Sequence, residues 1–205
     1  MEAFMYRHHP QTERLVQLVQ EGAVGDVQMI RAAFSFRAGD RSDIRLAAGL
    51  DGGALMDVGC YCVSGARLIA GEPNRVAAEQ TLGGDGVDVA FAATMRFPGD
   101  VLVHFDAGLT VAPERDELEV MGDEGSLFLN DPWHCRRPLI QLRRDGGGEQ
   151  IAVEAADPYR LEAENVSAAI RGEAAPLLGR EDAMGQALAI EALYRSAESG
   201  QMVSL

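Results

Sequence analysis

Apolar and polar residues alternate through two adjoining stretches in the middle of the chain. One side of each stretch is apolar: Val87, Val89, Phe91, Ala93, Met95 and Phe97 in the first, and Val101, Val103, Phe105, Ala107 and Leu109 in the second. The Phe97-Pro98-Gly99-Asp100 segment between them has the composition of a tight turn. A period of two on both sides of a turn predicts an antiparallel hairpin.

Other stretches predict strands on either side of this hairpin. Residues 27–36 alternate, with Ile30, Ala32, Phe34 and Phe36 on one side. Shorter strands are expected at 118–121, 126–129, 139–143 and 150–153, and the Asp145-Gly146-Gly147-Gly148 turn separates the last two. Residues 2–7 are predicted to form a short strand, and Gly39–Asp43 a loop.

Helical periodicity predicts four helices. The first begins at Pro10 and Thr12 and ends near Gly22, the second covers 54–70 and stops at Gly71 and Pro73, and two more cover 158–171 and 180–199. We expect the last helix to carry four large side chains near one face, Met184, Leu188, Leu193 and Tyr194. This order of elements is typical of an α+β fold, an open, mostly antiparallel sheet with helices packed on one face.

Charge and cysteine content narrow the classes of function. The 205 residues carry a formal net charge of −14, which disfavours binding to nucleic acid or to anionic membrane because both need a basic surface. No run of about 18 apolar residues is present. Three cysteines without a paired spacing favour a reducing compartment, so we expect a cytoplasmic protein.

Several common sites are absent from the sequence. No Gly-x-Gly-x-x-Gly opens a helix after a strand, and no phosphate-binding Gly-x-x-x-x-Gly-Lys is present. The four histidines lack the spacing of a metal site, so no metal is predicted. Cys60 and Cys62 point to different sides of the 54–70 helix and are interpreted as small core residues. The 18 cations are arginines, which leaves no lysine for a Schiff base or a general acid.

The 54–70 helix carries the pair of residues that is most suggestive of chemistry. Asp57 and Tyr61 are four positions apart and therefore share a face. Gly52, Gly53 and Gly59 leave the start of the helix bare, so that another backbone or a flat ligand can approach. A phenol can pass a proton to a developing alkoxide. The alternative is that Asp57 only neutralises the positive end of its helix and Tyr61 only packs; spacing alone leaves both open.

Several longer motifs resemble those of one family. They are Glu2-Ala-Phe-Met-Tyr-Arg-His-His-Pro10, Gly25-Asp-Val, Gly52-Gly-Ala-Leu-Met-Asp57-Val-Gly59-Cys-Tyr61, Gly71-Glu-Pro73, Phe97-Pro98-Gly99, Gly122-x-x-Gly125-Ser126 and Asp131-Pro132-Trp133. Together they resemble the C-terminal part of the Gfo/Idh/MocA oxidoreductases, in the branch of glucose–fructose oxidoreductase, NADP-dependent xylose dehydrogenase and dihydrodiol dehydrogenase. The resemblance covers essentially the whole chain, and the Asp57–Tyr61 helix is its most specific part.

The resemblance implies a fold, a reaction and a set of roles. Such enzymes join a Rossmann domain to a C-terminal domain like that of glyceraldehyde-3-phosphate dehydrogenase, and pass hydride between NADP or NAD and a sugar, polyol or related alcohol. Tyr61 would donate or accept the proton, and Asp57 would position the substrate. Tyr6, Arg7 and Pro10 would lie at the seam near the cofactor. The open sheet face would form a homodimer, since Val103 and its neighbours on one side of the strand alternate with polar residues on the other.

The departures from the family pattern concern activity. The glycine fingerprint and the lysine of the family's Glu-Lys-Pro motif would lie before residue 1, so residues 1–9 are expected to be the remnant of the last Rossmann strand and 10–205 the substrate-binding and oligomerisation domain. Asp51 stands where a third glycine is common, and Ser64 where an asparagine is common. We therefore expect this chain to be inactive in isolation. The alternative is a non-enzymatic, dimerising module that binds a small polar ligand or a partner protein.

Overall fold

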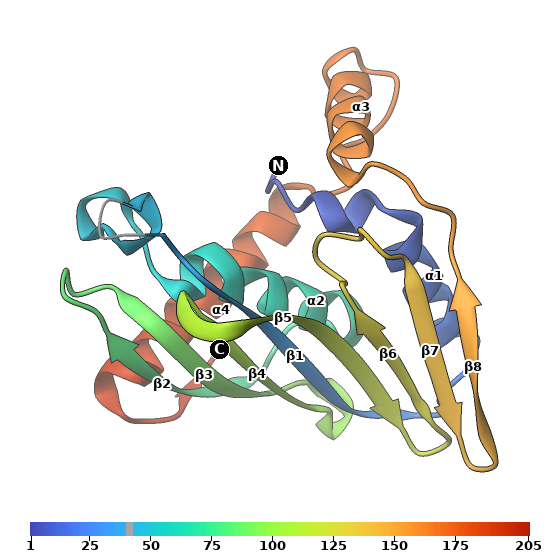
Figure 1. Cartoon of the computed structure of the whole chain (residues 1–205), viewed down its shortest axis with the longest axis horizontal. Coiled ribbons are helices and arrows are strands. Elements are labelled where there is room, and N and C mark those ends of the chain that lie inside the picture. The colour runs from blue at the N-terminus through green and yellow to red at the C-terminus, as the bar shows by residue number, and fades with distance from the viewer. Residues whose placement is uncertain (40–42) are drawn as a thin grey trace.

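The computed structural model describes residues 1–39 and 43–205, and these residues form one nine-stranded sheet with helices (Figure 1). Its strands run in the order β8-β7-β6-β5-β1-β4-β3-β2-β9. The bounds are β1 Val27–Arg37, β2 Arg75–Leu82, β3 Asp88–Arg96, β4 Leu102–Gly108, β5 Thr110–Gly122, β6 Ser126–Asn130, β7 Leu139–Arg144, β8 Gly147–Ala152 and β9 Val203–Ser204. Of the pairs in the described residues, only β1 with β4 is parallel.

The helices lie mainly on one face of the sheet. They are α1 (Pro10–Gln20), α2 (Cys60–Ala70), α3 (Pro158–Ile170) and α4 (Arg180–Ser199). A five-residue π-helical turn, Leu55–Gly59, leads into α2. α2 packs on β1 and β4, and α4 packs on β2, whereas α3 stands apart from the sheet beside the N-terminus (Figure 1). No helix in the described ranges has the length and apolar character needed to cross a bilayer.

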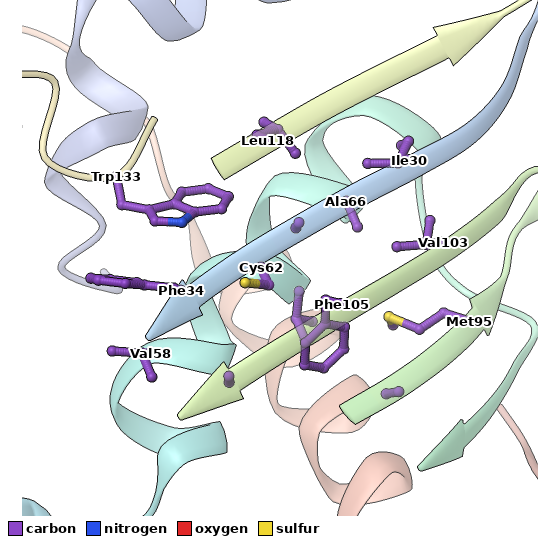
Figure 2. Close-up of a cluster of buried hydrophobic side chains, with 14 of the residues drawn as sticks. Ile30, Phe34, Val58, Cys62, Ala66, Met95, Val103, Phe105, Leu118 and Trp133 are labelled. Atoms are coloured by element: carbon purple, nitrogen blue, oxygen red, sulfur yellow. The ribbon is translucent and has the colours of Figure 1, made fainter. Parts of the chain in front are cut away.

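Strand register explains which side chains form the core. Ala32 of β1 lies opposite Phe105 of β4 and Leu118 of β5, so side chains of one pleat from three strands share a face. That face packs against α2, where Cys62 and Ala66 lie close to the strands (Figure 2). In the part of the chain that the structure describes, no helix packs on the opposite pleat, which carries Arg31, His104 and Glu119.

Most of the predicted elements are confirmed, including the α+β class, the hairpin of β3 and β4 and the four helices. The predicted strand at 2–7 is wrong, because Met5–His8 form a 3-10 helix. Met5 and Tyr6 turn inward there, and Thr12 Oγ1 donates to the Tyr6 carbonyl at 2.7 Å. The predicted Gly39–Asp43 loop includes residues 40–42, which lie outside the described residues.

The predicted apolar face of the last helix is also wrong in part. Leu193 is buried, but Met184 and Leu188 are 53% and 55% exposed. The contact stripe of α4 instead runs through Leu193 together with smaller and polar residues, namely Gln186, Ala189, Ala192 and Ser196. Small side chains let α4 approach the sheet closely, and Met184 and Leu188 lie on another side of the helix and point outward.

Two glycines set how closely the helix that contains Tyr61 approaches the sheet. A Cβ at Gly59 would lie 3.2 Å from Cβ of Ala107, and a Cβ at Gly65 would lie 2.8 Å from Cη2 of Trp133. Trp133 is fully buried and donates from Nε1 to the carbonyl of Ala33 at 3.1 Å. The indole ring is therefore fixed from both sides.

We predict that Gly65→Ala destabilises the protein by about 1–3 kcal/mol, because the added methyl group overpacks a ring that has no room to move. The measurement is the urea unfolding midpoint. Gly49→Ala is the matched control, since a Cβ there has no atom within 4 Å. Equal midpoints for the two variants would contradict this account of the packing.

Candidate functional site

The start of the Tyr61 helix is held by a buried carboxylate from the sheet. Asp88, the first residue of β3, accepts a hydrogen bond from the Leu55 amide at 2.7 Å and another from the Tyr194 hydroxyl at 3.0 Å. Gly53 has φ +134°, and a Cβ on it would collide with Oδ1 of Asp88. Glycine is thus needed for the approach of the protein's own carboxylate.

Gly52 and Asp51, the residues before Gly53, also have structural roles. A Cβ on Gly52 would collide with the carbonyl oxygen of Arg45. The structure therefore supports the approach of another backbone, one of the two predicted reasons for bare glycines at this point. Asp51 adopts a left-handed conformation with φ +53°. A short acidic side chain tolerates that region, which explains how an aspartate occupies a glycine-like position.

Aromatic side chains surround the ring of Tyr61. Its ring is 5.2 Å from that of Phe4, 5.5 Å from that of Phe34 and 6.2 Å from that of Trp133, measured between centroids. The hydroxyl lies 3.6 Å from the sulfur of Met5. Burial is the main reason that the pKa of Tyr61 is raised above its usual value. The phenol is therefore protonated at neutral pH and can donate a hydrogen bond.

Asp57 is paired with an arginine across the same pocket. Oδ2 of Asp57 lies 3.1 Å from Nε of Arg45, whose guanidinium also contacts Asp43 and lies over the ring of Phe36. Burial raises the pKa of Asp57, while the nearby charge of Arg45 lowers it. The pair thus offers a partly desolvated carboxylate and a guanidinium to a polar ligand.

These residues line one pocket of about 510 Å³. Its lining consists of Met5, Phe34, Phe36, Arg37, Arg45, Asp57, Val58, Tyr61, Glu114, His134, Arg136 and Tyr159. The predicted pair, Asp57 and Tyr61, is therefore brought together on one wall. The exposed lining is more polar than apolar, and the charged groups of Arg45, Asp57, Glu114 and Arg136 share it with the rings of Phe34 and Phe36.

His134 is a pocket residue that the sequence analysis missed. Its Nδ1 lies 2.7 Å from Oδ2 of Asp116, and the Asp116 side chain is only 7% exposed. Oδ1 of the same carboxylate accepts from the Trp133 amide at 3.1 Å. Burial raises the pKa of Asp116, and hydrogen bonds from His134 and Trp133 counteract this shift. The residues form an oriented aspartate–histidine pair.

The segment that carries His134 connects β6 to β7 and is anchored from several sides. Gln11 of α1 donates to the Asp131 carbonyl and accepts from the Leu139 amide. Asp131 and Cys135 have φ of +126° and +55°, which are uncommon for residues with a side chain. Strained backbone that is held by surrounding bonds often marks a functional position.

Glu114, Asp116 and His134 each offer an atom within 4.8 Å of the others, a spacing that a metal ion would accept. Arg136 already supplies positive charge there, with one nitrogen 3.0 Å from Glu114 and 3.8 Å from Asp116. Asp116 is also engaged with two donors. The cluster is therefore explained as an ion-pair network.

Tyr6, Arg7 and Pro10, predicted to lie near the cofactor, occupy the segment beside Tyr61. The Tyr6 hydroxyl is fully buried and donates to Ser64 at 2.8 Å. Arg7 lies 3.6 Å from Asp182 of α4, and Pro10 is the first residue of α1. Ser64, at the position where the family often has asparagine, thus joins α2 to the N-terminal segment and does not reach the pocket.

The two cysteines of the helix are packing residues, as predicted. Cys62 is fully buried and Cys60 partly so. Burial raises the pKa of the Cys60 thiol to about 12 and that of Cys62 well above its usual value. Neither thiol is a nucleophile near neutral pH, because the thiolate is the reactive form.

Comparison with known proteins gives a family and its relatives. Residues 12–128 match the family described as GFO/IDH/MocA C-terminal domain. D-xylose 1-dehydrogenase (NADP(+)) 2 of Haloferax volcanii is 35% identical over 210 residues, which cover 100% of this chain and 64% of the relative. Human trans-1,2-dihydrobenzene-1,2-diol dehydrogenase is 30% identical over 148 residues, 68% of this chain and 42% of the relative. The chain spans less than two thirds of the length of these relatives.

Solved structures agree with the fold. KijD10, a 3-ketoreductase from Actinomadura kijaniata solved with NADP and TDP-benzene, superimposes with a TM-score of 0.89 at 27% identity, over 96% of this chain and 62% of that one. The aldose-aldose oxidoreductase of Caulobacter crescentus, solved with glycerol, has a TM-score of 0.90 at 24% identity, over 99% and 63%. The predicted family and fold class are confirmed.

We predict that Arg45→Gln raises the pKa of Asp57 further, because the charge that favours the carboxylate is removed while the burial remains. A carbon-detected NMR titration of the side-chain carboxyl groups measures this. Arg160→Gln, which removes the partner of Glu164 on α3, is the control and should leave Asp57 unchanged. A lower Asp57 pKa in the Arg45 variant would contradict the assigned pairing.

Proposed function

Because the chain belongs to the Gfo/Idh/MocA family, we propose that it is the substrate-binding part of an NAD(P)-dependent oxidoreductase that acts on a sugar, polyol or related alcohol. The observation that carries the proposal is the pocket in which Tyr61 and Asp57 meet. The names of the xylose dehydrogenase and of KijD10's complex favour NADP as the cofactor. Hydride transfer itself is the chemistry of that dinucleotide when it is bound.

Tyr61 is the proton-transfer group in this proposal. When a carbonyl is reduced, negative charge develops on its oxygen, and a buried, protonated phenol can donate to that oxygen. In the oxidation direction the same oxygen gives up its proton. Asp57, with Arg45 beside it, holds a substrate hydroxyl and orients the reacting carbon toward the cofactor.

In this proposal, the boundary with the cofactor-binding part is formed by Tyr6, Arg7 and Pro10. Support comes from the position of Tyr6, whose ring centroid is 5.9 Å from that of Tyr61. The sequence contains neither a dinucleotide fingerprint nor a lysine. We therefore expect turnover only when this chain is joined to a dinucleotide-binding domain, and assays use the complete oxidoreductase. The three free thiols suit a reducing, cytoplasmic setting.

The same proposal includes a homodimer through the open face of the sheet. Along each strand, the side chains of this open face alternate with the buried ones. The small side chains of Ala92 and Thr94 leave part of the open face flat. Ion pairs such as Arg31 with Glu119 at 3.5 Å cover another part. A twofold axis across the face would bring each patch against its own copy.

We expect Tyr61→Phe to lower kcat of the complete oxidoreductase roughly 10²-fold or more, because the general acid is lost while ring packing is kept. Steady-state NADPH oxidation measures this. Ser199→Ala is the control: it removes the hydroxyl bond to the Arg195 carbonyl at the end of α4, outside the pocket lining, and should leave kcat within about twofold. An unchanged rate for Tyr61→Phe would return this tyrosine to a packing role.

For the dimer, we predict that light scattering gives twice the chain mass and that Ala92→Glu converts the protein to monomers. The new carboxylate would lie beside Asp106, its register partner, in a desolvated interface. Ala163→Glu, on the exposed surface of α3, should remain dimeric. A monomeric parent chain at micromolar concentration would overturn this part of the proposal.

A further inference from the structure

From the geometry of the pocket, we infer that His134 binds a second hydroxyl group of the substrate, so that the site selects diols and sugars over simple alcohols. This inference rests on the proposed function. Its starting observation is that His134 shares the pocket with Tyr61 and Asp57 but belongs to a different part of the fold, the connection from β6 to β7.

The contact with Asp116 determines which nitrogen of His134 is left for a ligand. Nδ1 is occupied by Asp116 at 2.7 Å, and the carboxylate is itself held by the Trp133 amide. Within the described residues, the polar contacts of His134 are those of Nδ1, and the side chain is 30% exposed. An imidazole whose Nδ1–H is bound to a carboxylate presents Nε2 as a hydrogen-bond acceptor.

The ring nitrogens of His134 are engaged differently from those of His9, an ordinary structural histidine. His9 is fully buried, and both of its ring nitrogens face backbone amides, those of Gln11 at 3.0 Å and Ala156 at 3.3 Å. His134 has one ring nitrogen engaged, and its side chain lines the pocket. Asp116, Trp133 and Gln11 hold the connection that carries His134. These contacts would keep Nε2 in place for a ligand.

One aromatic ring contacts both polar side chains. The Phe34 ring centroid is 5.5 Å from that of Tyr61 and 5.4 Å from that of His134, with the rings edge-on in each pair. The phenol and the imidazole therefore adjoin the same ring in the pocket lining. A substrate whose reacting oxygen meets Tyr61 can lie across Phe34 and place a neighbouring hydroxyl against Nε2, whereas an alcohol with one hydroxyl leaves Nε2 unpaired.

The test uses the 205-residue chain without cofactor and two matched ligands, trans-1,2-cyclohexanediol and cyclohexanol. Long-range ¹H–¹⁵N spectra of the histidine rings follow each titration. We expect the diol to bind more tightly and to shift the His134 signals saturably, while the signals of His8, His9 and His104 stay in place and serve as internal controls. Diol binding that leaves His134 unmoved, or no saturable binding of the diol, would overturn the inference.

Two variants then isolate the hydroxyl contact. His134→Phe keeps an aromatic ring but has no acceptor, and we expect about tenfold weaker diol binding with unchanged cyclohexanol binding, as for one lost hydrogen bond. His134→Gln restores an acceptor and should recover part of the preference, and it provides the test if the Phe variant does not fold. An unchanged preference in a folded variant would contradict the role of His134.

The complete oxidoreductase separates this inference from the proposed function. His134→Phe should raise KM for the diol about tenfold and change kcat less, because the contact is made in the ground state as well as in the transition state. If turnover survives Tyr61→Phe, the proposed function fails. If the diol-to-alcohol preference survives His134→Phe, only the role of His134 fails.

Discussion

Close packing of the Leu55–Ala70 segment on the sheet is the constraint on which the rest of this structure depends. Gly59 and Gly65 bring its backbone against Ala107 of β4 and the Trp133 ring. Asp88 of β3 fixes its first turn through the Leu55 amide. Interiors at this density transmit small displacements, so side chains at the edge of such a helix have defined positions. Tyr61 and Asp57 take their places in the pocket from this packing.

Aromatic rings then determine how strongly the polar groups act. Phe34 touches the rings of both Tyr61 and His134, and Trp133 lies beside Tyr61 and supports the connection that carries His134. Rings that exclude water lower the local dielectric constant, which strengthens a hydrogen bond to a ligand and raises the pKa of the buried acids. The raised pKa of Tyr61 and that of Asp57 share this cause, because burial is the largest contribution to both.

Features that depend on neighbours in the sequence were predictable. The hairpin of β3 and β4 follows from alternation around Pro98-Gly99, and the helices follow from spacing and from stop signals such as Gly71. The 3-10 helix at Met5–His8 was not predictable, because the apolar residues there pack inward around Tyr6 and have no strand to pair with. Likewise, the first residue of the π-helical turn before Cys60 is held by Asp88, 33 residues further along the chain.

The candidate site divides in the same way. Asp57 and Tyr61 were found because one helix carries both at a fixed spacing. His134 was missed because it lies in the connection between β6 and β7, whereas its partner, Asp116, lies on strand β5, and the sheet order β5-β6-β7 brings the two together. Arg45 reaches Asp57 from a connecting segment without periodicity. The nearest signal in the sequence was Asp131-Pro132-Trp133, which marked the connection although it did not identify its histidine.

The most direct test of the central claim is a crystal structure of the complete oxidoreductase with its dinucleotide and a polyol substrate or product bound. We predict that the Tyr61 hydroxyl lies about 2.6–3.2 Å from the reacting oxygen, which is the range of a proton-transfer contact. A polyol bound with its reacting carbon at the nicotinamide but its oxygen on another residue, beyond reach of Tyr61, would contradict the account.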